Sequence, residues 1–227
     1  MGKKLIFIIV LVVVVLGGYW AYQDYYLSNK IKDLSELPGC DYYLDRYPDA
    51  SEIIREACEY ESNLSDDVPT EEDPGRVTYL NAALTWKSAA DVLPLEQREE
   101  LNRRAVDVYR YYENKFDDHA YALRWNIAHL YQDLGEYELA EEYYLKAIES
   151  NNVSSEPYVA LYYLYENGDI EKSVEEVDAF FQKAFDFVSD NPDIILDRYL
   201  DFLEKNGLDS RAAEVRAELR TRYPNRY

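Results

Sequence analysis

The sequence predicts an all-α protein, in which an N-terminal transmembrane helix precedes a solenoid of about three to four helix pairs. Three observations predict this fold class. Residues 5–22 carry no charge. After residue 75 the apolar residues recur with a helical period, and no strand-like alternation interrupts them. Finally, Gly135, Gly168 and Gly207 each end one helical pattern and precede another, at separations of 33 and 39 residues (135 to 168 and 168 to 207).

The uncharged run from Leu5 to Tyr22 has the length of a helix that spans a membrane. Its eighteen residues make a helix of about 27 Å, close to the thickness of the hydrocarbon layer. Lys3 and Lys4 precede the run, so residues 1–22 are predicted to anchor a single-pass protein with a cytoplasmic N-terminus and an extracytoplasmic remainder. The alternative is a cleaved signal peptide, because the most apolar part, Leu5 to Leu16, is only twelve residues long. Either alternative exports the rest of the chain.

The segment between this run and the repeats contains both cysteines. Residues 23–60 form a juxtamembrane segment in which Cys40 and Cys58 stand eighteen residues apart. In an exported protein such a pair can form a disulfide, which stabilises a fold by about 3 kcal/mol in the chain-entropy model. The alternative is two small buried apolar side chains. Residues 61–75 follow as an acidic linker with six carboxylates, so we expect a domain boundary there and a helical repeat domain over residues 76–227.

The composition and the motif content exclude several classes of function. The chain has 24 Lys and Arg residues against 45 Asp and Glu residues, for a net charge of −21. This charge repels nucleic-acid phosphates, so no nucleic-acid partner is expected. Because the sequence has no zinc-protease motif, phosphate-binding glycine loop, nucleophile elbow or paired CxxC, we expect neither catalysis nor a cofactor. Two competing interpretations are an enzyme that uses His129 with Asp133, one turn away, and a helical domain that binds a divalent cation. The acidic series for such a cation is Asp186, Asp190, Asp193, Asp197 and Asp201.

The segment around Gly135 resembles the tetratricopeptide repeat (TPR). The matching small, aromatic and turn positions are Ala128, Tyr131, Gly135, Tyr137, Ala140, Tyr144 and Ala147. The units around Gly168 and Gly207, and a helix pair within residues 76–115, are similar to the pattern but match it less well. The resemblance covers residues 76–226 and is strongest over residues 121–224. It implies a right-handed superhelix of stacked helix pairs with a concave face.

The resemblance also implies where a partner binds. In TPR proteins one stripe of the first helix of each pair lines the concave face. In this sequence the stripes are Trp125, His129, Gln132 and Asp133, then Tyr158, Tyr162 and Tyr165, and then Asp197, Asp201 and Glu204. We therefore expect a scaffold or adaptor, in the cell envelope or extracytoplasmic space, that binds a protein or peptide as an extended basic or apolar segment. The tyrosines suit a groove and a helix interface equally, and an acidic stripe is also typical of an ordinary solvated face.

Overall fold

The computed structural model describes residues 33–64, 75–117 and 120–224, and all the regular elements in these ranges are helical. The chain divides into two compact units, residues 1–37 and 38–227. In the described part of the first unit, Leu34–Glu36 form a short 3-10 helix η1, and the Asp33 carboxylate accepts a hydrogen bond from the Ser35 amide at its start.

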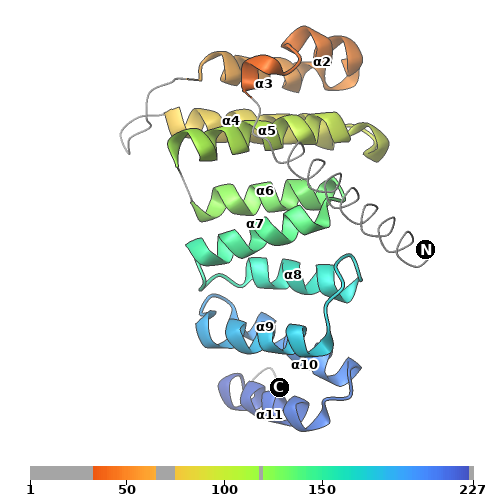
Figure 1. Cartoon of the computed structure of the whole chain (residues 1–227), viewed down its shortest axis with the longest axis vertical. Coiled ribbons are helices and arrows are strands. Elements are labelled where there is room, and N and C mark those ends of the chain that lie inside the picture. Colours follow the sequence, from red (N-terminus) through yellow and green to blue (C-terminus); the bar gives the residue numbers. More distant parts are fainter. Residues whose placement is uncertain (1–32, 65–74, 118–119, 225–227) are drawn as a thin grey trace, which may run out of the picture. The chain divides into compact units, whose positions relative to one another are not determined.

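The second unit is a stack of helices that follow one another in chain order (Figure 1). The α-helices are α2 (Cys40–Arg46), α3 (Ser51–Ser62), α4 (Gly75–Asp91), α5 (Glu99–Phe116), α6 (Tyr121–Asp133), α7 (Tyr137–Ser150), α8 (Glu156–Glu166), α9 (Val174–Phe187), α10 (Pro192–Lys205) and α11 (Asp209–Arg222). Two further 3-10 helices are η2 (Pro48–Ala50) and η3 (Leu95–Gln97). The prediction of an all-α protein built of repeated helix pairs is confirmed in the described residues.

The three glycines that predicted the repeats end helices α6, α8 and α10. Gly135, Gly168 and Gly207 have φ values of 72°, 76° and 69°, in the left-handed region that a side chain disfavours. After Gly135, the Glu136 amide donates a hydrogen bond of 2.9 Å to the carbonyl of Tyr131. This contact is the one that closes a Schellman turn, so each glycine stops one helix and lets the chain reverse into the next.

Small residues allow the paired helices to approach closely. Ala128 on α6, and Ala140 and Ala147 on α7, are fully buried between the two helices and their neighbours. Tyr144 on α7 is also fully buried. The core therefore alternates small and large side chains, as close packing of helix pairs requires.

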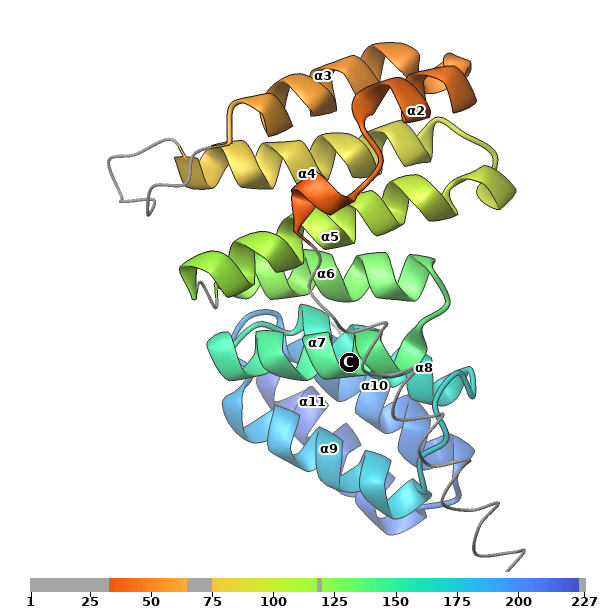
Figure 2. The same ribbon diagram turned by 45° about the horizontal axis from the view of Figure 1, so that its top comes forward.

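The compact unit begins before the acidic linker, which corrects the predicted domain boundary. Helix α3 packs along α4, and Figures 1 and 2 both show the two helices side by side. Ile54 and Ala57 on α3 are fully buried. Residues 61–75 therefore do not separate a juxtamembrane segment from the repeat domain. The acidic composition of residues 61–75 predicted a boundary because it describes that segment alone. It carries no information on whether the helices on either side of the segment pack together.

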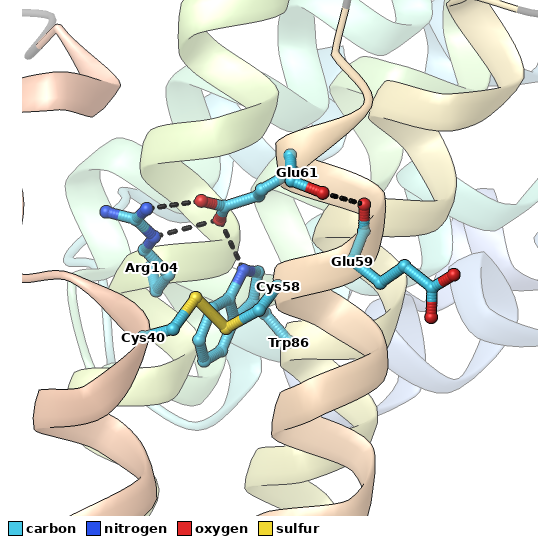
Figure 3. Close-up of a disulfide and its surroundings, with 7 residues drawn as sticks. Cys40, Cys58, Glu59, Glu61, Trp86 and Arg104 are labelled. Atoms are coloured by element: carbon cyan, nitrogen blue, oxygen red, sulfur yellow. Dashed lines mark hydrogen bonds and ion pairs between the residues drawn. A yellow bond between two sulfur atoms is a disulfide. The ribbon is translucent and has the colours of Figure 1, made fainter.

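A disulfide and a buried ion pair hold this N-terminal end together (Figure 3). Cys40 at the start of α2 is bonded to Cys58 on α3, with an S–S distance of 2.01 Å. Nearby, the Glu61 carboxylate accepts hydrogen bonds from Trp86 Nε1 on α4 and from Arg104 on α5, the Nε contact being 2.9 Å. The side chains of Arg104 and Glu61 expose only 6% and 12% of their surface. One carboxylate of α3 therefore contacts both helices of the next pair.

The predicted localisation as a single-pass membrane protein is corrected by a structural finding. Across residues 33–64, 75–117 and 120–224, the structure contains no helix with the length and apolar character needed to cross a bilayer. The run from Leu5 to Tyr22, on which that prediction depended, lies outside the described residues.

Replacing Glu61 with glutamine should destabilise the protein by about 3 to 5 kcal/mol, because the change leaves the buried Arg104 guanidinium without a compensating charge. Equilibrium unfolding in urea measures this loss. The matched control is Glu218→Gln, which breaks an exposed pair with Arg222 and should cost less than about 1 kcal/mol. Similar losses in the two variants would show that the Glu61 pair does not hold α3 on the stack.

Candidate functional site

The helix pair α6–α7 presents a cluster of aromatic side chains along α6. The Trp125 ring lies edge-on to His129 at 4.2 Å, stacks on Tyr121 at 6.3 Å, and lies 5.4 Å from Tyr144 on α7. Tyr144 is fully buried, whereas Trp125 and His129 remain partly exposed. A rigid core tyrosine thus supports two rings that reach the surface, an arrangement typical of an aromatic anchor for a partner.

Hydrogen bonds fix the orientation of this cluster. The Tyr144 hydroxyl donates to Gln132 Oε1 at 2.6 Å and lies 3.2 Å from His129 Nδ1. Since the hydroxyl has one hydrogen, donation to Gln132 leaves its oxygen to accept from an Nδ1–H of His129. Gln132 and His129 are therefore held by the same buried hydroxyl, and both sit on the side of α6 that carries Trp125.

The same side of the stack continues onto α4. Lys87 Nζ lies 3.4 Å from Asp133 Oδ2, which brings the C-terminal parts of α4 and α6 together. Leu84 precedes Lys87 by about one turn, and Val77 precedes Leu84 by about two, so all three share a face of α4. Leu84 and Val77 expose 46% and 55% of their surface. We call this surface the α4–α6 face; its members are Val77, Leu84, Lys87, Trp125, His129 and Asp133.

Sequence reasoning selected the α6 residues of this face but missed those on α4. The sequence contains a signal for them: when Ala83 of the helix pair within residues 76–115 is aligned with Ala128, Leu84 and Lys87 take the places of His129 and Gln132.

The predicted aromatic middle of the groove is corrected. Tyr158 and Tyr162 on α8 expose only 1% of their surface each. The Tyr162 ring packs 5.3 Å from Phe181 on α9, and the Tyr158 ring packs 5.4 Å from Phe180. Tyr165 remains partly exposed and donates a hydrogen bond of 2.7 Å to Glu141 on α7. Two of the three tyrosines thus form a helix interface, the alternative that the sequence left open, because α9 covers them.

The predicted acidic end of the groove is largely neutralised by neighbours. Asp201 accepts a hydrogen bond of 2.9 Å from the Tyr162 hydroxyl and lies 2.8 Å from Lys205 Nζ. The hydrogen bond from Lys205 lowers the pKa of the Asp201 carboxyl, and Tyr162 adds to this effect. Glu204 pairs with Arg216 on α11, and Asp197 also has an interaction partner. These carboxylates therefore do not present free charge to a basic partner.

The electrostatics of the cluster follow from burial. Burial lowers the pKa of His129 from its usual 6.5, Asp133 opposes this shift, and Lys87 adds to it. Burial also raises the pKa of the Tyr144 hydroxyl. Around neutral pH the α4–α6 face therefore carries a neutral imidazole beside the ion pair of Lys87 with Asp133, and the Tyr144 phenol beneath it stays protonated.

No metal site accompanies this face. Among the residues that the structure describes, no group of three His, Cys, Asp or Glu side chains is arranged to hold a metal ion. The acidic series from Asp186 to Asp201 therefore forms no such group in the described chain.

Tyr162→Ala should lower the free energy of unfolding by about 3 to 5 kcal/mol, because it removes a buried ring from the α8–α9 interface. Thermal or urea unfolding measures the loss. Tyr162→Phe keeps the ring and loses the bond to Asp201, so its cost should be only about 1 kcal/mol. The neighbouring Tyr163, which is partly exposed, provides the matched control as Tyr163→Ala. If Tyr162→Ala and Tyr163→Ala lose the same free energy of unfolding, Tyr162 is not buried in the α8–α9 interface.

His129 should titrate below pH 6.5 in the folded protein, as an NMR titration of its ring protons would show. Because the unfolded chain binds this proton more readily, stability should be complete above pH 6.5 and should fall as pH drops towards the lower folded pKa. The His129→Gln variant should lose this component of the pH dependence. A folded pKa at or above 6.5 would contradict the burial of the ring.

Comparison with known proteins agrees with the geometry of α6 and α7. Residues 121–153 match the family model described as tetratricopeptide repeat, so a TPR is present over these two helices and the turn that follows. The TPR resemblance of this segment is confirmed. No curated protein matches the chain.

Proposed function

From the TPR at residues 121–153, we propose that the protein is a scaffold that binds a segment of another protein on the α4–α6 face. TPRs generally mediate interactions between proteins, and the proposal assigns this chain no catalytic role. The main support for the proposal is the position of Trp125, which is partly exposed while its ring contacts the fully buried ring of Tyr144.

The chemistry of the face indicates an apolar partner segment. Leu84 and Val77 are exposed on the side of α4 that carries Lys87, and the ion pair of Lys87 with Asp133 on the face is already formed. An apolar side chain of the partner gains free energy by leaving water and covering these groups. The side-chain amide of Gln132 offers polar contacts at the edge of the same surface.

A stack of helix pairs suits this role because its surface is preorganised. Trp125 needs no large rearrangement to meet a partner, since Tyr121, His129 and Tyr144 already contact its ring. Binding therefore avoids much of the entropic cost of ordering a flexible side chain.

The test uses the full chain with a photoreactive phenylalanine analogue at position 84, expressed in the source cells. Irradiation should crosslink a discrete partner at position 84, and not when the analogue replaces Leu145, which is 41% exposed on α7. The affinity of the captured partner is then measured. Trp125→Ala should weaken binding by about 2 kcal/mol, roughly thirtyfold, as expected for a central aromatic anchor.

The control for the affinity measurement is Leu145→Ala, which should leave binding unchanged. Circular dichroism and thermal unfolding establish that both variants are folded before they are compared. The proposal fails if position 84 crosslinks no more strongly than position 145, or if folded Trp125→Ala binds as tightly as the wild type.

A further inference from the structure

A pocket of about 230 Å³ lies where the start of α5 meets the end of α6. We call it the α5–α6 pocket. Its wall contains Leu95 and Glu96 of η3, Arg98, Glu99 and Asn102 of the following segment, and Asp133 of α6. Only Asp133 also belongs to the α4–α6 face, so the pocket is a separate feature of the edge formed by the helix-to-helix turns.

The pocket has more negative than positive charge available. The Glu96 side chain makes no ion pair or hydrogen bond to any residue described by the structure. Glu99 pairs with Arg103 at 3.2 Å, but its side chain is 69% exposed and the pair is open to solvent. The single cation in the wall, Arg98, donates from Nε and Nη2 to the backbone carbonyls of Leu93 and Asp91, at 2.8 and 3.0 Å. The Arg98 guanidinium is thus already bonded to the backbone at and just after the end of α4.

Asn102 gives a second, independent indication of a ligand. The residue exposes only 2% of its surface, and its side-chain Oδ1 is buried without a hydrogen-bond partner in the structure. A buried polar atom without a partner is costly, and native proteins rarely leave one. Asn102 lines the pocket, and because its terminal amide torsion is soft, rotation about it can turn the buried Oδ1 towards a donor inside the pocket.

We propose that the α5–α6 pocket binds the guanidinium group of an arginine side chain from a partner protein. A cation suits the pocket because Glu96 lies in its wall with Glu99 and with Asp133, which Lys87 contacts at 3.4 Å, and a donor suits it because Asn102 Oδ1 has no partner. Acceptors stand on two sides of the pocket, on the η3–α5 segment and on α6, which a planar guanidinium with five N–H groups satisfies better than a compact ammonium.

The rim of the pocket adds an apolar contact. Leu95 is the most exposed of the large apolar residues in the described chain, at 78%. A partner with an apolar residue next to its arginine would cover Leu95 while the guanidinium enters. The C-terminal end of α6 also favours a cation, because its last carbonyls carry the negative end of the helix dipole, while Glu99 and Glu100 offset the positive start of α5.

The test is a titration of the ¹⁵N-labelled full chain with Nα-acetyl-argininamide at low ionic strength, followed by NMR. The side-chain amide of Asn102 should shift in a saturable manner. The matched probe is Nα-acetyl-citrullinamide, which has the same shape and is neutral, and it should bind roughly tenfold more weakly because it lacks charge-assisted hydrogen bonds.

Three variants complete the test. Glu96→Gln should weaken binding of the arginine probe roughly three- to tenfold, whereas Glu175→Gln, an exposed carboxylate on α9, should leave it unchanged. Asn102→Leu replaces the amide by a side chain of similar shape and should abolish saturable shifts of the backbone amides of Leu95 and Glu96. If Asn102→Leu does not fold, Glu96→Gln and the neutral probe decide the outcome.

The proposal is overturned if the two probes bind equally, if no saturable shift occurs at Asn102, or if Glu96→Gln binds as the wild type does. Trp125→Ala should titrate like the wild type, since Trp125 does not line the pocket. Failure of the α4–α6 face as a binding surface and failure of the arginine pocket are therefore separate results.

Discussion

The burial of apolar stripes between successive helix pairs is the constraint on which the rest of this structure depends. A single pair such as α6–α7 has apolar residues on both of its sides and cannot remove them from water alone. Ala128, Ala140 and Ala147 let the helices approach, and Tyr144 fills the space between them. Each further pair adds a layer to the same core, which explains why the helices follow one another in chain order along the stack.

The two ends of the described stack are built differently from its middle layers. At the C-terminal end, α11 buries Ala212, Val215 and Leu219, and most of its other residues are polar. At the N-terminal end, α2 and α3 cover α4, and the disulfide of Cys40 with Cys58 ties them together. The buried pair of Glu61 and Arg104 then fixes this cover to the first full helix pair.

The layer built from α8 and α9 departs from this regularity. The connection between these helices, residues 167–173, is longer than the turn between α6 and α7, residues 134–136. In the structure Phe180 and Phe181 of α9 lie against Tyr158 and Tyr162 and bury their rings. On α6, by contrast, Trp125 and His129 remain partly exposed, and the proposed binding face is therefore on α4 and α6 and not on α8.

The sequence by itself determined the helices, their order, and the repeat over residues 121–153. Those features depend on local properties: a glycine at 135, 168 or 207 adopts a positive φ more readily than other residues, and the period of apolar residues assigns each side chain to a face of its own helix. The same local information placed Trp125, His129 and Gln132 together on α6. The separation of eighteen residues between Cys40 and Cys58 allowed a disulfide but did not require one.

Only the tertiary structure decided which faces stay open. Periodicity shows that Tyr158 and Tyr162 lie on one stripe of α8, but whether α9 covers that stripe depends on how the longer connection packs. Likewise, the partners of Asp201 and Glu204 include Tyr162 and Arg216, which other helices supply. The packing of α3 on α4 was likewise not predictable from spacing, because it depends on contacts between helices that lie on opposite sides of the acidic linker. Burial is a property of the neighbours that surround a side chain, and a chain's own spacing does not specify those neighbours.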